Sequence, residues 1–419
     1  MHAIRPSAAA LVAAPLLAAI CATAAHAQSL TAVPMLPDWS GASAASLSAD
    51  GAAVVGVGTT STGGHAYISD SDGVIDLGVL IPPDRFSIAI AVSANGGFIV
   101  GDSAYQFGPG AHAILWQHYG FLQDLGTIGG YNGTSTAYGV SADGSIVVGE
   151  SATSLSNEAF RWTSTDGMFG LGALSAGSYS QAYAVSADGS VIVGGSGIGA
   201  AYHAFRWTQA DGMQDLGLLQ GATYSRAQAI SADGAVIVGS SGGDTTGVAF
   251  RWTAAAGMLP LGPTASLPVS EALAANADGS VIVGDAWQNP ADRHAFLWTS
   301  ALGLVDLRDY LTGHGVDTTG WTLTYARGLS ADGLTIAGDG LYNNQPRGWI
   351  ATLPRCGSAD FDCDGAVGTD QDILAFFNCL AGFCPPPPCT STADFNHDGA
   401  VGTDQDIEAF FRVLAGGNC

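Results

Sequence analysis

The sequence predicts an all-β protein built mainly from seven repeats, followed by a small α-helical module. The 419-residue chain contains 59 glycines and is 47% apolar but only 11% charged, which favours short strands joined by tight turns. A Ser-Ala-Asp-Gly string recurs about every 45 residues, the length of one β-propeller blade. The end of the chain instead carries a duplicated acidic loop followed by apolar residues at helical spacing. These observations predict a seven-bladed β-propeller and a separate C-terminal domain.

The first 27 residues have the pattern of a secretory signal peptide. Arg5 precedes an apolar run from Ala8 to Ala25, and the run ends in a small-residue cleavage pattern at Ala27. We therefore expect residues 1–27 to be removed, leaving an extracellular protein without a membrane span. An uncleaved anchor is the alternative, because the run is close to membrane-spanning length.

Residues 28–354 consist of seven copies of one unit. In one copy, the apolar segments 182–185 and 191–194 flank Asp188-Gly189, which predicts a tight hairpin. Phe205 and Trp207 alternate with Arg206, and residues 213–216 follow a second Asp-Gly, which predicts another hairpin. Each unit should therefore hold four short strands. The copies start at Ser48, Ser93, Ser141, Ser186, Ser231, Asn276 and Ser330.

The two ends of the repeat array complement each other. The seventh copy stops at Leu353 without its fourth strand. Leu30, Val33 and Leu36 carry the apolar pattern of that missing strand. This predicts that the N-terminal strand completes the last blade and closes the ring, which removes two exposed sheet edges. An open β-solenoid is the alternative.

The repeated motifs indicate a family. The string His-Ala-Phe-Arg-Trp-Thr at 203–208, with near-copies at 112, 158, 248 and 294, accompanies Ala-Asp-Gly and Asp-Leu-Gly. Together they resemble the HAF family of bacterial extracellular repeats, which implies secretion and a β-rich repeat fold but no established reaction. The histidine position is too variable for a metal or catalytic role, so we expect an exposed structural position. It is occupied by His65, His112, Glu158, His203, Val248, His294 and Arg347.

Charge and motifs narrow the possible functions of the repeats. The chain carries 12 Lys plus Arg against 36 Asp plus Glu, a formal net charge of −24, which disfavours nucleic-acid partners. Gly239–Gly243 has the letters of a nucleophile elbow but leads to a predicted strand rather than a helix. Irregular insertions offer a better lead, because such loops shape binding surfaces in propellers. They are Ile81–Phe86, Tyr105–Gly110, Asn289–Arg293 and Tyr310–Trp321.

The C-terminal residues 355–419 predict calcium binding. Residues 359–382 and 393–416 are identical at 19 of 24 positions, and each copy opens with oxygen-bearing side chains at loop positions 1, 3 and 5 and Gly at position 6. This pattern suits Ca²⁺, with a backbone carbonyl at position 7. We expect two Ca²⁺ sites. Their candidate ligands are Asp360, Asp362, Asp364, Ala366, Asp370 and Asp372 in the first loop, and Asp394, Asn396, Asp398, Ala400, Asp404 and Asp406 in the second.

One loop and one helix, repeated 34 residues apart, resemble a type I dockerin. The resemblance implies a calcium-dependent interaction with a cohesin-like partner. The sequence departs from the dockerin pattern because Gln371 and Gln405 stand at position 12, where an acid normally closes the shell. Either Asp372 and Asp406 or Asp370 and Asp404 take that role. A disulfide-stapled variant with another extracellular partner stays open, because six cysteines lie here: Cys356, Cys363, Cys379, Cys384, Cys389 and Cys419.

Three functions are compatible with this organisation. The first is a secreted, non-catalytic binding or display propeller, tethered through the dockerin-like module and possessing a face suited to a glycan. The second is an extracellular carbohydrate-active component, an O-glycosyl hydrolase that degrades polysaccharide. The third is a self-associating cell-envelope protein. Acids converging at one mouth of the channel would favour the enzyme, whereas a mouth of Gly, Ala and Ser would favour binding.

Overall fold

The computed structural model describes residues 28–61, 63–80, 86–104, 110–118, 120–130, 133–176, 178–243, 246–262, 267–300, 302–353, 361, 369–383, 395 and 402–414. The repeat region is all-β, as predicted, and consists of small antiparallel sheets. Five sheets have four strands, and one eight-stranded sheet combines two such units. The predicted signal peptide lies outside the described residues. No helix in the part described is long and apolar enough to cross a membrane.

Each unit contains up to four strands in chain order. The first three units contain β2 (Gly41–Leu47), β3 (Val54–Thr59), β4 (Gly64–Asp70) and β5 (Gly73–Asp76); β6 (Ser87–Val92), β7 (Phe98–Ala104), β8 (Ala111–Gln117) and β9 (Leu122–Asp124); and β10 (Ser135–Val140), β11 (Val147–Ala152), β12 (Asn157–Thr163) and β13 (Gly167–Gly170). The next two contain β14 (Ser180–Val185), β15 (Val191–Ile198), β16 (Ala201–Thr208) and β17 (Gly212–Asp215); and β18 (Tyr224–Ile230), β19 (Ile237–Gly242), β20 (Val248–Thr253) and β21 (Gly257–Pro260). The last two contain β22 (Val269–Ala275), β23 (Val281–Trp287), β24 (Arg293–Thr299) and β25 (Gly303–Asp306); and β26 (Trp321–Leu329), β27 (Thr335–Tyr342) and β28 (Gln345–Thr352), preceded by α1 (Leu307–Gly313).

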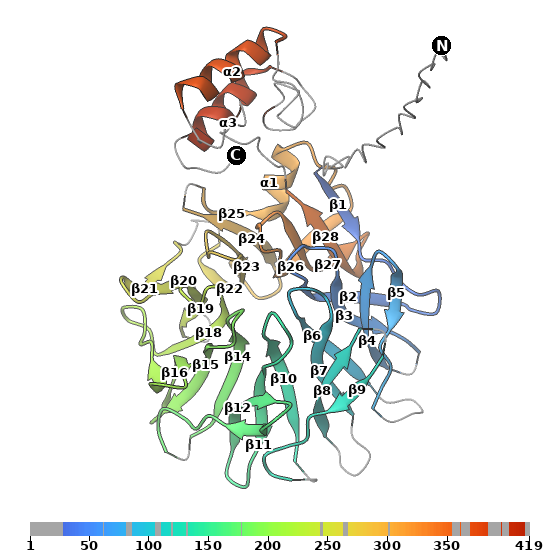
Figure 1. The fold of residues 1–419 in the computed structure, drawn as a ribbon, viewed down its shortest axis with the longest axis vertical. Coiled ribbons are helices and arrows are strands. Elements are labelled where there is room, and N and C mark those ends of the chain that lie inside the picture. Colours follow the sequence, from blue (N-terminus) through green and yellow to red (C-terminus); the bar gives the residue numbers. More distant parts are fainter. Residues whose placement is uncertain are drawn as a thin grey trace, which may run out of the picture.

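The N-terminal strand completes the last sheet. Strand β1 (Ser29–Ala32) pairs antiparallel with β28, with Ser29 opposite Thr352 and Ala32 opposite Trp349. Figure 1 shows the units following one another around a centre, so that β1 lies beside β28 at the start and end of the repeats. The first strands of successive units contact one another, and β26 also contacts β2. The predicted complementarity of the two ends is therefore present in the strand pairing.

The Ser-Ala-Asp-Gly strings form the predicted turns between the first and second strands. In the turn at Ser186, the serine hydroxyl donates to Asp188 Oδ1 at 2.7 Å and accepts the amide of Val191 at 3.0 Å. Gly189 adopts a φ of +74°, which favours glycine. These bonds hold the pKa of Asp188 below its usual range. The aspartates of these turns are structural.

Backbone bonds link neighbouring turns. The amide of the alanine in one turn donates to the carbonyl of the alanine in the next turn, and the last turn donates back to the first, from Ala331 to Ala49 at 2.7 Å. This chain of contacts is independent of side chains, which explains why the residue at this position can be a plain alanine. The other donor and acceptor pairs are Ala49 to Ala94, Ala142 to Ala187, Ala187 to Ala232, Ala232 to Ala277 and Ala277 to Ala331.

Buried serines on the first strands join five of the units to the unit that precedes each of them. Ser225 of β18 is fully buried, accepts the amide of Ala204 in β16 at 2.9 Å and donates to the carbonyl of Gly217 at 2.6 Å. The acceptor satisfies an outer-strand amide that would otherwise be buried without a partner. We call this contact the serine joint. The equivalent amide and serine pairs are Ala66 and Ser87, Ala113 and Ser135, Ala159 and Ser180, and Ala249 and Ser270.

The apolar cores lie between units. Phe205 packs with Ile192 of its own unit and with Val148 and Leu171 of the preceding one. Val33 and Ala337 pack with Tyr67 of the first unit, so a core of the same kind joins the end of the array to its beginning. At these contacts Phe205 and Tyr67 each fill the space between two neighbouring units. Burial of such a ring contributes about 1.5–3 kcal/mol.

The histidine position needs a correction, because it is not simply an exposed position. Where histidine is present, its Nδ1 lies 2.6–3.0 Å from the aspartate of the Asp-Leu-Gly motif on the neighbouring strand, and His112 is only 2% exposed. In the third unit that aspartate is replaced by Gly170, and Glu158 itself accepts the amide of Gly172. The motif is a cross-strand pair that fixes the outer turn. The pairs are His65 with Asp76, His112 with Asp124, His203 with Asp215, and His294 with Asp306.

The C-terminal module contains the two predicted helices, α2 (Asp370–Leu380) and α3 (Asp404–Leu414). Thr369 caps α2 in a capping box with Asp372. Four fully buried phenylalanines form the core, and Phe376 and Phe410 stack with centroids 4.1 Å apart. Cys379 is buried beside them at 4% exposure. The other five cysteines of the module lie outside the described residues, so the disulfide framework stays a prediction.

A serine joint should contribute measurably to stability. We expect Ser225→Ala to lower the free energy of unfolding by about 1–3 kcal/mol, because the buried amide of Ala204 loses its acceptor. Ser190→Ala is the matched control, since Ser190 is exposed and its side chain bonds only to Asp188 in the same turn. We expect the control to change stability by less than about 1 kcal/mol. Urea denaturation measures both, and equal losses would contradict the role of the joint.

Candidate functional site

The two ends of the strands differ in chemistry. At the end that carries the Ser-Ala-Asp-Gly turns, the same residues recur in five units and bond within the turn, and the other two units each differ at one position. At the opposite end, where the first strands begin, side chains differ from unit to unit. We call this end the mouth. Because strands alternate in direction, the insertions Asn289–Arg293 and Tyr310–Trp321 lie at the mouth. Residues 81–85 and 105–109 of the other two insertions lie outside the described residues.

One layer of the mouth carries most of its charge. Residues of the first strands lie opposite residues of the second strands, for example Glu271 opposite Asp285 and Thr136 opposite Glu150. Directly opposed residues in an antiparallel pair project on the same side. Insertion residue Arg293 adds a guanidinium group to this layer. The charged residues, which we call the mouth cluster, are Asp102, Glu150, Arg226, Glu271, Asp285, Arg293, Arg327 and Asp339.

Ion pairs organise the cluster. Arg226 pairs with Glu271, and Gln228 Nε2 donates to the same carboxylate at 2.7 Å. Arg293 pairs with Asp285 and stacks on Trp287, with its guanidinium carbon 3.8 Å from the ring centroid. Planar guanidinium groups suit both the ion pairing and the stacking seen here. These contacts hold the charged groups in fixed positions.

A second pair of contacts lies on the last unit. Arg327 Nε donates to Asp339 Oδ2 at 2.9 Å, and the Ala44 amide of the first unit donates to Asp339 Oδ1 at the same distance. The guanidinium carbon of Arg327 lies 4.4 Å from the Tyr325 ring centroid. Asp339 therefore connects the last unit to the first at the mouth, and burial raises its pKa.

Burial perturbs two other carboxyl groups of the cluster. Asp285 has a side chain only 1% exposed, and burial, assisted by the charge of Glu271, raises its pKa to about 7 against the attraction of Arg293. Burial raises the pKa of Asp102 to about 6, although a hydrogen bond from Thr136 opposes the shift. One oxygen of each carboxyl group, Oδ1, is buried without a hydrogen-bond partner. Both groups can therefore exchange a proton near neutral pH.

A cavity of about 340 Å³ opens beside these ion pairs. Its walls include Glu271 and Arg226 on one side and Trp287 and Arg293 on another, with Tyr224 at the edge. Arg226 Nε is buried without a hydrogen-bond partner. The combination of ring faces and fixed polar groups is typical of small-ligand sites.

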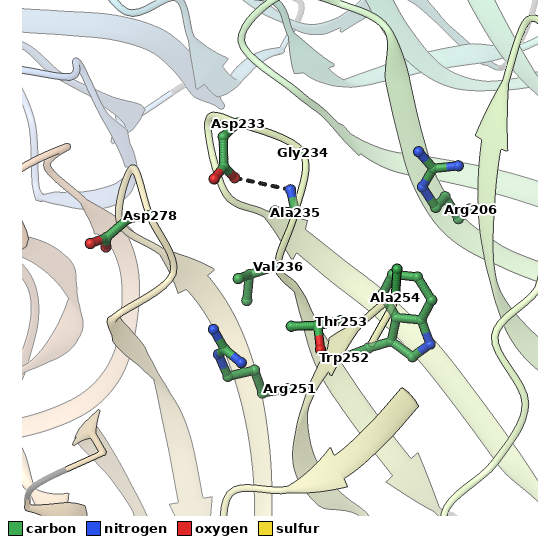
Figure 2. A pocket seen from close by; sticks show the side chains of 10 residues that line it. All are labelled: Arg206, Asp233, Gly234, Ala235, Val236, Arg251, Trp252, Thr253, Ala254 and Asp278. Atoms are coloured by element: carbon green, nitrogen blue, oxygen red, sulfur yellow. Dashed lines mark hydrogen bonds between the residues drawn. The ribbon is translucent and has the colours of Figure 1, made fainter. Parts of the chain in front are cut away.

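A larger recess at the turn end has a different character. Its volume is about 640 Å³, and Figure 2 shows Arg206, Arg251 and Trp252 around it, with Asp233 and Asp278 on neighbouring turns. Asp233 accepts the amide of Ala235 and the hydroxyl of Ser231, so its carboxylate is committed to the turn. These are repeat residues in structural roles, which is why we assign the candidate site to the mouth.

The predicted calcium ligands are only partly described. Asp372 is fully buried, and its carboxylate accepts the amides of Phe361 and Thr369, each at 2.7 Å. Asp406 repeats this arrangement with Phe395 and Thr403. Asp370 and Asp404 are exposed at the first helical positions. The remaining candidates lie outside the described residues: Asp360, Asp362, Asp364, Ala366, Asp394, Asn396, Asp398 and Ala400.

This geometry is compatible with a metal loop. A buried carboxylate that binds the second residue of the acidic loop brings both ends of that loop to the start of the helix, as a wrapped cation site requires. Which acids close each loop, Asp372 and Asp406 or Asp370 and Asp404, stays a prediction. Within the described residues, no group of three His, Cys, Asp or Glu side chains is arranged to hold a metal ion.

The module also exposes apolar side chains. Phe377 of α2 and Phe411 of α3, which occupy equivalent positions in the duplication, are each 43% exposed and lie 6.1 Å apart between ring centroids. Leu374 is 61% exposed on the same helix as Phe377. A contiguous apolar patch of this kind on a small domain indicates an interaction surface.

Sequence reasoning missed the mouth cluster. The residue after the repeated glycine of the second strand varies while its neighbours stay constant, and this variation is the signal that could have found it. The position reads Val57, Asp102, Glu150, Gly195, Ser240, Asp285 and Asp339. The Gly239–Gly243 string leads into strand β20, so it is not a nucleophile elbow, as predicted.

Comparisons with known proteins concern the fold. No protein-family model and no curated protein matches the chain. An oligogalacturonate lyase from Vibrio parahaemolyticus has a TM-score of 0.54 at 11% identity over 78% of this chain and 93% of its own. An oligogalacturonate lyase in complex with manganese has a TM-score of 0.51 at 13% identity, covering 74% of this chain and 88% of its own. TolB from Acinetobacter baumannii has a TM-score of 0.42 at 15% identity, and the match covers 76% of this chain and 65% of the TolB chain. Together with the strand topology, the two lyase structures support a β-propeller fold.

Stability should depend on pH through Asp285. Because its pKa is about 7 in the folded protein and near 3.8 in an unfolded chain, the folded state holds an extra proton between these values. The contribution of Asp285 to the free energy of unfolding is therefore largest below about pH 4, and it falls as the pH rises to about 7. We expect Asp285→Asn to flatten the melting temperature between pH 5 and 7.5, roughly the window where the proton is lost.

Asp233→Asn is the control for this measurement. Hydrogen bonds lower the pKa of Asp233, so its titration lies below that window. The control should keep the wild-type slope between pH 5 and 7.5. Parallel profiles for wild type and Asp285→Asn would contradict the assignment.

Proposed function

We propose that this protein is an exported, closed seven-bladed propeller that binds a small polar ligand at its mouth and is tethered by a calcium-dependent dockerin-like module. The observation that carries the binding role is the mouth cluster, a set of fixed charges and aromatic rings around a cavity of about 340 Å³. Seven copies of a four-stranded unit, with β1 pairing to β28, support the closed arrangement. The HAF-like motifs and the signal-like first 27 residues support export.

The tethering role is supported by the module. Its duplicated acidic loops provide the oxygen ligands that Ca²⁺ prefers, and Asp372 and Asp406 are positioned to close them. Phe377 and Phe411 provide a duplicated apolar surface for a partner. Bound Ca²⁺ would offset the net charge of −9 on residues 356–419, which carry ten acids and one arginine.

A second candidate function is supported by one observation at the mouth. Glu271 and Asp285 are directly opposed, and the raised pKa of Asp285 makes it a proton donor near pH 7 while Glu271 is held by Arg226. A pair of carboxyl groups at one site is what glycoside hydrolysis requires. The acids at the mouth meet the criterion for the enzyme alternative. Release of reducing sugar that is abolished by Glu271→Gln would favour it over simple binding.

Removal of Ca²⁺ should affect the thermal stability of the module and not that of the propeller. We expect calorimetry to show two melting transitions in Ca²⁺, because the self-repelling module has a small core and depends on the ion. EDTA should lower or remove the module transition and leave the propeller transition unchanged. A single transition that EDTA does not affect would contradict calcium-dependent folding.

A capture experiment tests the tether. The full chain, immobilised through its N-terminus, should retain its extracellular partner in Ca²⁺ and release it in EDTA. Phe377→Ser combined with Phe411→Ser should abolish retention in Ca²⁺, because it removes the exposed apolar pair. The control is Phe169→Ser, since Phe169 is an exposed phenylalanine on β13 of the repeat region. Retention unaffected by the double variant would exclude this surface.

A further inference from the structure

Three tyrosines form a stack at the mouth. Tyr202 lies between Tyr179 and Tyr224, with ring centroids 5.2 and 6.1 Å away and ring planes within 14° and 10° of its own. Tyr179 precedes β14, Tyr202 lies on β16 and Tyr224 begins β18, so the stack spans two neighbouring units. Tyr179 is 48% exposed and presents the accessible end of the stack.

The backbone is adapted to hold this stack. Gly195 occupies the position where other units carry an acid, and a Cβ there would lie 2.3 Å from Cε1 of Tyr202. Tyr202 and Tyr224 are also paired through the parallel bridge that merges two units into the eight-stranded sheet. The absence of a side chain at Gly195 leaves room for the ring of Tyr202, and the bridge between units holds Tyr202 next to Tyr224.

The hydroxyl groups are fixed by a polar network beneath the rings. Tyr202 and Tyr183 both donate to Gln181 Oε1, at 3.0 and 2.6 Å, and Gln181 Nε2 donates to Glu150 Oε2 at 2.9 Å. Tyr224 lines the cavity that also contains Glu271. The stack thus offers a rigid aromatic face beside groups that bind hydroxyls.

Charge decides which ligand suits this surface. The mouth cluster has five carboxyl groups and three guanidinium groups. If Asp102 and Asp285 are protonated, three negative charges face three positive ones, and if both are ionised, the negative charges exceed the positive ones by two. Carboxyl groups outnumber guanidinium groups in the cluster, and each guanidinium group is paired with one of these carboxyl groups, so the cluster is not suited to a polyanion.

We propose that the mouth binds a neutral oligosaccharide: the apolar face of one sugar ring lies on Tyr179, and neighbouring sugar units extend past the tyrosine stack, so that their hydroxyl groups bind the polar groups of the cavity lined by Tyr224. The face of an aromatic ring is negative and attracts the slightly positive C–H groups of a sugar. Arg226 and Glu271 line the cavity with side chains 29% and 16% exposed, and they provide a donor and an acceptor for sugar oxygens. This inference rests on the proposed binding role of the mouth.

Calorimetric titration of the full chain in Ca²⁺ tests the inference. The probes are neutral cello-, xylo-, manno- and laminari-oligosaccharides, with oligogalacturonate as the anionic counterpart. We expect one neutral series to bind and oligogalacturonate to bind at least about tenfold more weakly. Tyr179→Ala should lower the affinity for the neutral ligand by about tenfold. Tyr179→Phe, which keeps the ring, should have the affinity of the wild type.

Tyr342→Ala is the matched control. Tyr342 is 42% exposed and contacts Trp321 on the last unit, away from the stack, so its loss should leave the affinity unchanged. Absence of binding by every neutral series, tighter binding of oligogalacturonate, or unchanged affinity in Tyr179→Ala would each overturn the inference. A peptide or other non-sugar ligand lost in Arg226→Ala would preserve the proposed binding role while excluding the sugar.

Discussion

The serine joint is the interaction on which the repeat region depends. A small sheet of four strands has two faces and little core of its own, so it must bury both faces against neighbours. Each joint places a buried hydroxyl opposite an outer-strand amide of the preceding unit, as Ser225 does for Ala204. Phe205 and its equivalents then fill the space between units with apolar atoms. The hydrogen bonds of buried polar groups and the packing of apolar side chains therefore stabilise the same interface.

The repeated chemistry leaves one layer free to vary. The turn aspartates, the joint serines and the histidine and aspartate pairs each have internal partners, so they contribute rigidity rather than recognition. The residue after the repeated glycine varies among the units and is valine, aspartate, glutamate, glycine or serine. Asp285 and Glu150 occupy this position, and Gly195 makes room there for Tyr202. A rigid set of repeats with one variable layer is an effective way to hold a few charged groups in fixed positions.

Much of the fold could be predicted from the sequence, because its signals are local and repeated. The dipeptide Asp188-Gly189 is by itself enough to predict a tight turn. Leu30 and Val33 carry the apolar pattern of the strand that is missing from the last unit. The mouth cluster could not be found in the same way. The pairing of Arg293 with Asp285, and the stacking of Tyr179 on Tyr202, depend on how separate strands and loops meet in space. Likewise, the role of His112 was misjudged because its partner Asp124 lies on another strand.

Native-state hydrogen exchange tests the closed ring most directly. If the units form a ring joined through β1 and β28 and through the contact of Ala331 with Ala49, opening any joint disturbs the whole. Peptides from the first and last units should then exchange as slowly as peptides from the fourth unit. An open array would behave differently, because its terminal units have one neighbour each. Faster exchange at both ends, decreasing toward the middle, would contradict the closed ring.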